Sequence, residues 1–263
     1  MTDDEKYLFD LTGYLVIRGA LGEEEVRLCN EAIDHHKELF KEREESLSGG
    51  SSALEGTSHR LDISRMLAWE RPWCEIFRDL LIHPNVLRYL QGILGTGYRL
   101  DHGPGLIAMD PGCEGCTLHG GGIESSDFST AYFFNGGRIL TGLTVVEYLL
   151  ADEGPGEGGV AVVPGSHKAN LACPQEMKLL EKYQEQVVEV NGKAGDAVIF
   201  TEALTHGTLP WTGKHQRRAL LYKFSPGFQA FGSGHHEVTY PDYVADMTEE
   251  QRQVMEHPHI RRG

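Results

Sequence analysis

With 263 residues, of which 40% are hydrophobic, the chain is long enough to bury the core of one large domain. Its 39 acidic residues outnumber its 24 basic ones, and the formal charge of −15 disfavours binding to nucleic acid or to an anionic membrane surface. No stretch approaches the ~20 consecutive apolar residues that a membrane span requires. An acidic start without a secretory signal and five unevenly spaced cysteines indicate a reducing compartment, so we expect a cytoplasmic protein.

The first part of the chain predicts a strand followed by a layer of helices. Residues 11–18 are rich in β-forming side chains and predict the strand. A helix is expected to begin at Glu23, because the three glutamates of its first turn interact favourably with the helix dipole. The glycine- and serine-rich residues 46–58 are interpreted either as a lid over a site or as a disordered connection. Residues 73–94 predict two helical segments, separated at His83-Pro84 and ended by Gly95.

From Tyr98 onward, short apolar runs alternate with glycine-rich turns, a pattern typical of a β-sandwich or jelly roll. The runs are residues 106–109, 139–150, 160–163, 187–190, 197–200 and 218–224. Short helices are predicted at residues 174–183 and after Thr248, which begins a capping-box pattern. We therefore expect a mainly β protein with added helices. Residues 1–263 are expected to form a single domain, with a helical layer at about 1–96, a jelly-roll core at about 97–226 and a C-terminal extension at 227–263.

Three residues far apart in the chain suggest a non-haem iron site that works with an oxoacid, rather than a hydrolytic triad. His119 and His206 are separated by most of the predicted core, and Arg217 follows on an apolar strand. Non-haem iron(II) is usually held by two histidines and one carboxylate. Arginine offers a planar fork that binds a carboxylate bidentately and stays charged when buried. Alternation along the strand puts one of Arg217 and Arg218 inside the barrel, and we predict that Arg217 is the inner one.

Residues 158–168, Gly-Gly-Val-Ala-Val-Val-Pro-Gly-Ser-His-Lys, resemble the strand-and-turn signature of the phytanoyl-CoA dioxygenase (PhyH) family. The order and spacing of the other motifs support this resemblance, which covers roughly residues 11–224. Members of the family are iron(II)- and 2-oxoglutarate-dependent oxygenases that use O2. They are built on a double-stranded β-helix, a cupin-like jelly roll. Because the family's substrates are diverse, the resemblance implies only a small-molecule substrate.

The resemblance also implies a role for individual residues. His119 and His206 would bind iron(II) through neutral imidazole nitrogens. Arg217, eleven residues after His206, corresponds to the arginine that grips the distal carboxylate of 2-oxoglutarate. Thr208 corresponds to a position that often hydrogen-bonds the same carboxylate.

The carboxylate ligand is the departure from the family pattern, because Gly121 stands where members usually have Asp or Glu. One interpretation is a coordination position free for chloride or bromide, as in the aliphatic halogenases of the same superfamily, which carry glycine or alanine there. A second interpretation is ordinary hydroxylation, with another carboxylate completing the iron site. Glu124 and Asp127 follow closely, and Glu147 interrupts an apolar strand, where a charge needs a partner.

A third interpretation is a domain that binds metal weakly or not at all and serves as a non-catalytic binding module. The presence of both histidines and of Arg217 argues against it. The sequence specifies neither the substrate nor the oligomeric state.

Overall fold

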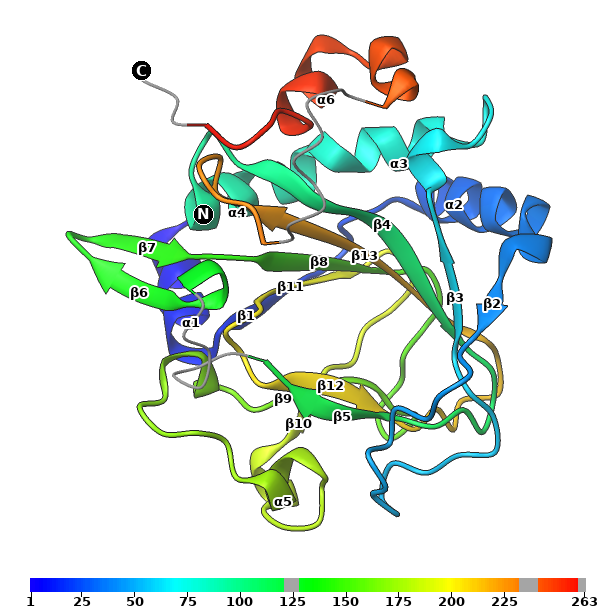
Figure 1. The fold of residues 1–263 in the computed structure, drawn as a ribbon, viewed down its shortest axis with the longest axis vertical. Helices are drawn as coiled ribbons and strands as arrows, with labels where there is room; N and C mark the ends of the chain where they lie inside the picture. Colours follow the sequence, from blue (N-terminus) through cyan, green and yellow to red (C-terminus); the bar gives the residue numbers. More distant parts are fainter. Residues whose placement is uncertain (121–127, 232–240, 260–263) are drawn as a thin grey trace.

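Two antiparallel β-sheets face each other and form a jelly roll (Figure 1). The computed structural model describes residues 1–120, 128–231 and 241–259. The major sheet has the strand order β1 (Tyr14–Ile17), β11 (Ala197–Thr201), β8 (Thr144–Leu149), β13 (Arg217–Ser225), β4 (Arg99–Met109), β3 (Leu61–Ser64) and β2 (Lys41–Glu42). The minor sheet has the order β10 (Val188–Glu189), β9 (Gly159–Val162), β12 (His206–Leu209) and β5 (Cys116–His119). A separate hairpin joins β6 (Tyr132–Asn135) to β7 (Arg138–Thr141).

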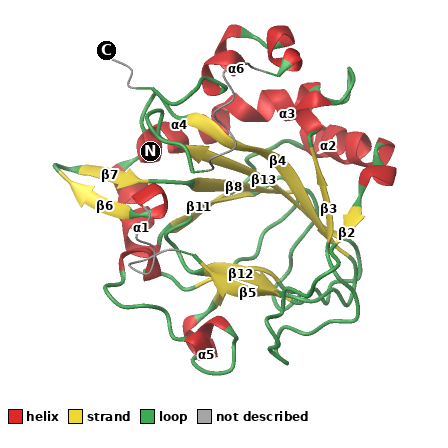
Figure 2. Ribbon diagram, viewed as in Figure 1, coloured by secondary structure: helices red, strands yellow, loops and turns green. Residues whose placement is uncertain are grey.

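Helices cover the outer face of the major sheet (Figure 2). They are α2 (Glu23–His35), α3 (Glu75–Asp79), α4 (Pro84–Leu94) and α6 (Glu249–Val254), whereas α1 (Asp3–Thr12) and α5 (Gln175–Lys178) lie elsewhere. The carboxylate of Glu25 accepts a hydrogen bond from the backbone N–H of Gly22 at 2.7 Å, which satisfies one of the unpaired donors at the start of α2. Within the described part of the chain, none of the helices combines the length and apolar character that crossing a bilayer demands.

Both faces of the central strands are buried, because helices pack on one side and the minor sheet on the other. On β13, Leu220, Tyr222 and Phe224 point into the outer core beneath the helices. Leu221 points the other way and packs against the inner core, which includes Val145 and Phe200. The alternation of side chains along a strand therefore separates a helix-facing set from a set that faces the interior between the sheets.

The same alternation separates two consecutive arginines. Arg217 is only 1% exposed and faces the interior, on the same face of β13 as Leu221. Arg218 lies on the outer face, where its Nη2 is 2.6 Å from Oδ1 of Asp34 in α2. Arg217 is therefore the inner residue of the pair.

The N-terminal segment differs from the sequence-based expectation. Leu11 and Thr12 end a helix that was not predicted, and the strand begins only at Tyr14. Gly13 stops this helix with a φ of 85°, and its N–H donates to the carbonyl of Phe9 at 2.7 Å. The helix is amphipathic only weakly and buries only Phe9, so its sequence carries little periodic signal.

Residues 46–58 form an ordered loop rather than a disordered connection. The carboxylate of Glu114 accepts hydrogen bonds from the Ser46 hydroxyl at 2.5 Å and from the Leu47 N–H at 2.9 Å. Ser48 and Ser51 are buried in the same loop. The loop is thereby tied to the segment that leads into β5.

Gly120 allows β5 to approach the turn before β12. Its φ is 117°, and a Cβ at this position would lie 2.2 Å from the carbonyl oxygen of Leu204. We predict that Gly120→Ala lowers the free energy of unfolding by about 2–3 kcal/mol, because alanine is strained at this φ and also collides with backbone. Urea denaturation measures this change. Gly103→Ala is the control, since a Cβ there meets nothing within 4 Å, and equal effects of both substitutions would contradict the prediction.

Candidate functional site

A cavity of about 600 Å³ lies between the inner faces of the two sheets. The minor sheet and the turn before it contribute one group of polar side chains, and the major sheet contributes the other. They are His119, Glu202, His206 and Thr208 on one side and Glu147, Arg217 and Lys223 on the other. The cavity therefore collects metal-ligating and charged groups from residues far apart in the sequence.

His119 and His206 are direct partners across the antiparallel pair of β5 and β12, and their ring centroids are 4.5 Å apart. Nδ1 of His119 lies 3.0 Å from the carbonyl of Thr117, and Nδ1 of His206 lies 2.8 Å from the carbonyl of Leu204. Because a carbonyl only accepts hydrogen bonds, each Nδ1 carries the proton and each Nε2 keeps its lone pair. Such backbone contacts orient histidines that bind a metal through Nε2.

His206 is held in its neutral form. Burial lowers the pKa of His206 to about 4, and the ring packs against Phe200 with centroids 4.7 Å apart. At neutral pH a metal ion therefore has no proton to displace from this imidazole. His119 is exposed at the edge of the cavity, so the pair combines one anchored and one accessible side chain.

Glu202 is a cavity residue that the sequence analysis did not single out. Its Oε2 lies 3.9 Å from Nε2 of His206, and its Oε1 lies 2.7 Å from Nζ of Lys223. Burial raises the pKa of Glu202, but the neighbouring His206 and Lys223 outweigh this effect and hold the pKa below its ordinary value. A signal was available in its spacing, since Glu202 precedes His206 by four residues in the turn that follows a buried strand.

Arg217 is buried between two glutamates. Its Nη2 lies 2.6 Å from Oε1 of Glu147, and its Nε lies 2.9 Å from Oε1 of Glu153. Gly159 provides the space for this group, because a Cβ there would lie 2.2 Å from Oε2 of Glu153. Glu147, a candidate iron ligand in the sequence analysis, is thus in contact with the guanidinium.

This group holds two acids and only one base. Burial raises the pKa of Glu147 and raises that of Glu153 to about 7, although the Arg217 charge opposes both shifts. A second buried negative charge beside a single guanidinium is costly. One of the two carboxyl groups therefore holds a proton readily near neutral pH.

The remaining predicted residues fall into two sets. Thr208, two residues after His206 on β12, lines the same cavity as Arg217. Gly121, Glu124 and Asp127 lie outside the described residues.

Comparison with protein families gives one match that covers most of the chain. The model of the phytanoyl-CoA dioxygenase (PhyH) family matches residues 9–219. The chain belongs to this family. A search of the curated proteins finds no significant match.

Solved structures confirm the jelly-roll fold of this PhyH-family chain. HygX from Streptomyces hygroscopicus, with nickel and 2-oxoglutarate bound, is 21% identical, with a TM-score of 0.72 over 92% of this chain and 96% of HygX. HygX with iron bound is similar to the same degree, with a TM-score of 0.68. SnoK, a non-heme alpha-ketoglutarate-dependent carbocyclase from nogalamycin biosynthesis, is 18% identical with a TM-score of 0.61 over 92% of each chain.

The proton shared by Glu147 and Glu153 predicts a pH dependence of stability. Between pH 4.5 and about 7 the folded chain keeps a proton on Glu153 that the unfolded chain has released, so this residue makes unfolding easier as the pH rises. Glutamine needs no proton at this position. We therefore predict that, as the pH rises from 5 to 8, the free energy of unfolding of Glu153→Gln increases by about 1–3 kcal/mol relative to that of the natural chain. Urea denaturation at both pH values measures the difference.

Other groups, such as His206, contribute equally to the pH dependence of the free energy of unfolding in both proteins, so their contributions cancel in this comparison. Glu185→Gln is the matched control, because Glu185 is exposed and its removal leaves the buried group intact. Parallel pH profiles for Glu153→Gln and the natural chain would show that the buried group holds no extra proton.

Proposed function

We propose that this PhyH-family chain is an iron(II)- and 2-oxoglutarate-dependent oxygenase that acts on a small molecule with O2 as cosubstrate. The observation that carries the proposal is the pairing of His119 and His206 across β5 and β12, in one cavity with the buried Arg217. When bound, iron and 2-oxoglutarate would supply the oxidising power that removes hydrogen from an unactivated C–H bond of the substrate.

The cavity holds the donor types of a two-histidine, one-carboxylate metal site, and these side chains would rotate toward one another to share an ion. His119 and His206 would bind it through Nε2, which their backbone contacts leave with a free lone pair. We assign the carboxylate to Glu202, whose Oε2 already faces Nε2 of His206 while Lys223 holds its other oxygen. Gly121 has no side-chain oxygen to offer, and Glu147 is in contact with Arg217.

The cavity can hold the carboxylate of an oxoacid beside Arg217 if one of the neighbouring glutamates is protonated. Arg217 offers Nη1, which lies 3.7 Å from Sδ of Met109, while Glu147 and Glu153 contact its other nitrogens. A third carboxylate would leave an excess of buried negative charge unless a proton is bound nearby. The raised pKa of Glu153 makes that proton available, and the Thr208 hydroxyl lines the same cavity as a second donor. We therefore assign Arg217 and Thr208 to 2-oxoglutarate.

Hydroxylation is the outcome that a Glu202 ligand favours, because an anionic carboxylate at the metal opposes binding of a halide. Halogenation with chloride or bromide is the second candidate, and the sequence His119-Gly120-Gly121 is the observation that favours it. The two outcomes differ in whether Oε2 of Glu202 or a halide occupies the remaining coordination position of the metal. A non-catalytic binding module would show neither reaction.

The first test is consumption of 2-oxoglutarate. With iron(II) and O2, the purified protein is expected to release succinate, slowly without substrate and faster with a suitable small molecule. His206→Ala should reduce this release at least about 100-fold, since losing a ligand costs more than disturbing its support. His215→Gln, a histidine outside the cavity, is the control. Absence of both succinate release and iron binding in the natural chain would support the binding module instead.

Product mass and metal affinity then separate the two chemistries. A gain of one oxygen in buffers that contain chloride or bromide supports hydroxylation, and incorporation of halogen supports the second candidate. We predict that Glu202→Gln weakens binding of Co²⁺ in the cavity at least about tenfold, followed by the part of the Co²⁺ absorption spectrum that His206→Ala removes. Gly121→Asp in the same chain should restore part of the affinity by returning a carboxylate to the usual family position. Unchanged affinity in Glu202→Gln would remove Glu202 as a ligand.

A further inference from the structure

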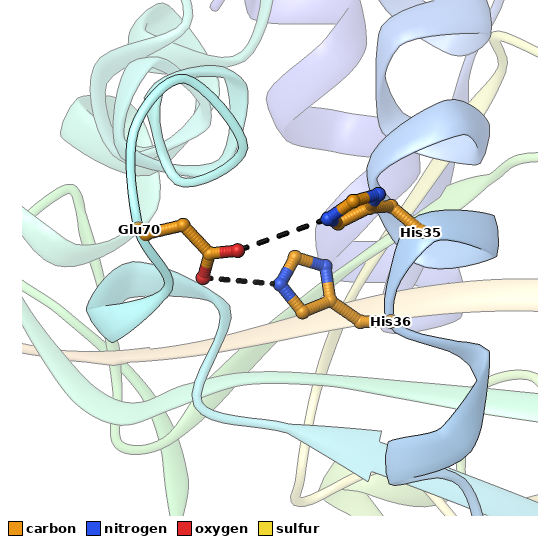
Figure 3. A group of neighbouring side chains, drawn as sticks. All are labelled: His35, His36 and Glu70. Carbon is orange, nitrogen blue, oxygen red and sulfur yellow. Dashed lines mark hydrogen bonds and ion pairs between the residues drawn. The ribbon is translucent and has the colours of Figure 1, made fainter.

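A second group of metal-ligating side chains lies in the helical layer, outside the cavity. His35 is the last residue of α2, His36 follows it as the C-cap, and Glu70 lies just after the short 3-10 helix Met66–Ala68 (Figure 3). Their ligand atoms all lie within 4.8 Å of one another. Among the described residues, this is the only such group of three or more histidine, cysteine or acidic side chains.

The hydrogen bonding of His36 leaves a lone pair aimed at a carboxylate. Nδ1 of His36 lies 2.8 Å from the carbonyl of Ala32, so this nitrogen carries the proton. Nε2 then faces Oε2 of Glu70 at 3.3 Å, and Nε2 of His35 lies 3.8 Å from the other oxygen of Glu70. Two lone pairs that face each other at this distance repel, and a proton or a metal ion between them removes the repulsion.

Two tryptophans hold the imidazole rings in place. His36 stacks on Trp69 with centroids 4.0 Å apart, and His35 stacks on Trp73 with centroids 4.3 Å apart. The His36 side chain is only 7% exposed. Its backbone, with φ −108° and ψ 24°, leaves the helix, which lets two consecutive side chains reach the same carboxylate. The two imidazole ligands are therefore arranged before any ion binds, whereas the Glu70 side chain is exposed.

We propose that His35, His36 and Glu70 bind a divalent transition metal of the zinc class, with water in the fourth position. Tetrahedral zinc with bonds of about 2.0–2.1 Å places its ligands about 3.3–3.4 Å apart. The His36–Glu70 separation of 3.3 Å matches this spacing, and the 3.8 Å at His35 needs only a small side-chain rotation. Imidazole and carboxylate ligands suit Zn²⁺, Ni²⁺ and Co²⁺. This inference does not depend on the proposed oxygenase activity.

The fluorescence of the tryptophans provides a direct measurement of metal binding at this group. The chain has three, and two of them stack on the proposed ligands. Titration with Ni²⁺, a paramagnetic quencher, is expected to reduce the fluorescence of the natural chain in a saturable manner. Glu70→Gln and the double variant His35→Gln/His36→Gln should each weaken this binding at least about tenfold. At 100 times its Kd, Zn²⁺ should raise the unfolding midpoint by about 5 °C, and the variants should lose this rise.

Two control variants test whether the quenching by Ni²⁺ arises at His35, His36 and Glu70. His206→Ala should keep the quenching, because the cavity site is separate from the tryptophan pair. His215→Gln should keep it as well, although His215 lies 5.4 Å from the third tryptophan, Trp211. If Ni²⁺ leaves the fluorescence unchanged, or if Glu70→Gln binds it as well as the natural chain does, the group is only a proton-bridged ion pair and the proposal is wrong.

Discussion

The buried charge of Arg217 is the constraint on which the interior of this protein depends. A guanidinium that is 1% exposed must be compensated, and Glu147 on β8 and Glu153 after it contact two of its nitrogens. These contacts join the centre of the major sheet to the segment that leads into the minor sheet. Gly159 is needed because any larger residue would occupy the space of the Glu153 carboxylate.

The compensation also determines what the cavity accepts. Two acids around one base favour a bound proton near neutral pH, and the proposed binding of an anionic ligand depends on that proton. On the opposite wall, the two histidines are oriented by backbone carbonyls rather than by other side chains. Their orientation therefore follows from the register of β5 and β12, and a shift of that register would separate them.

The same residue types occur in two different settings. In the cavity, His206 and Glu202 are buried between the sheets, where Lys223 adds a cation. In the helical layer, His35 and His36 stack on indole rings at the end of α2, and Glu70 faces both imidazoles. In the first setting, the proposed metal would face molecules held in the cavity. The second links the end of α2 to the segment after the 3-10 helix Met66–Ala68, and the proposed ion would join these two parts of the helical layer.

Local sequence signals were sufficient for much of the fold. The three glutamates after Gly22 located the start of α2 through their favourable position at the helix dipole, and Thr248 located α6 because its side chain bonds to the backbone of Gln251. Alternation within one strand predicted that only one of Arg217 and Arg218 faces the interior, and the structure shows that it is Arg217. The order of the motifs indicated the family and named His119 and His206, which the structure places in one cavity.

Tertiary structure alone decided which acidic residues meet which partners. Glu147 and Arg217 are 70 positions apart, and Glu202 reaches Lys223 only through the pairing of strands. The meeting of His36 and Glu70 likewise depends on how α2 packs against a loop 34 positions away. Sequence periodicity reports which face of an element is buried. It carries no information about the element that lies opposite, because that contact is set by the packing of distant segments.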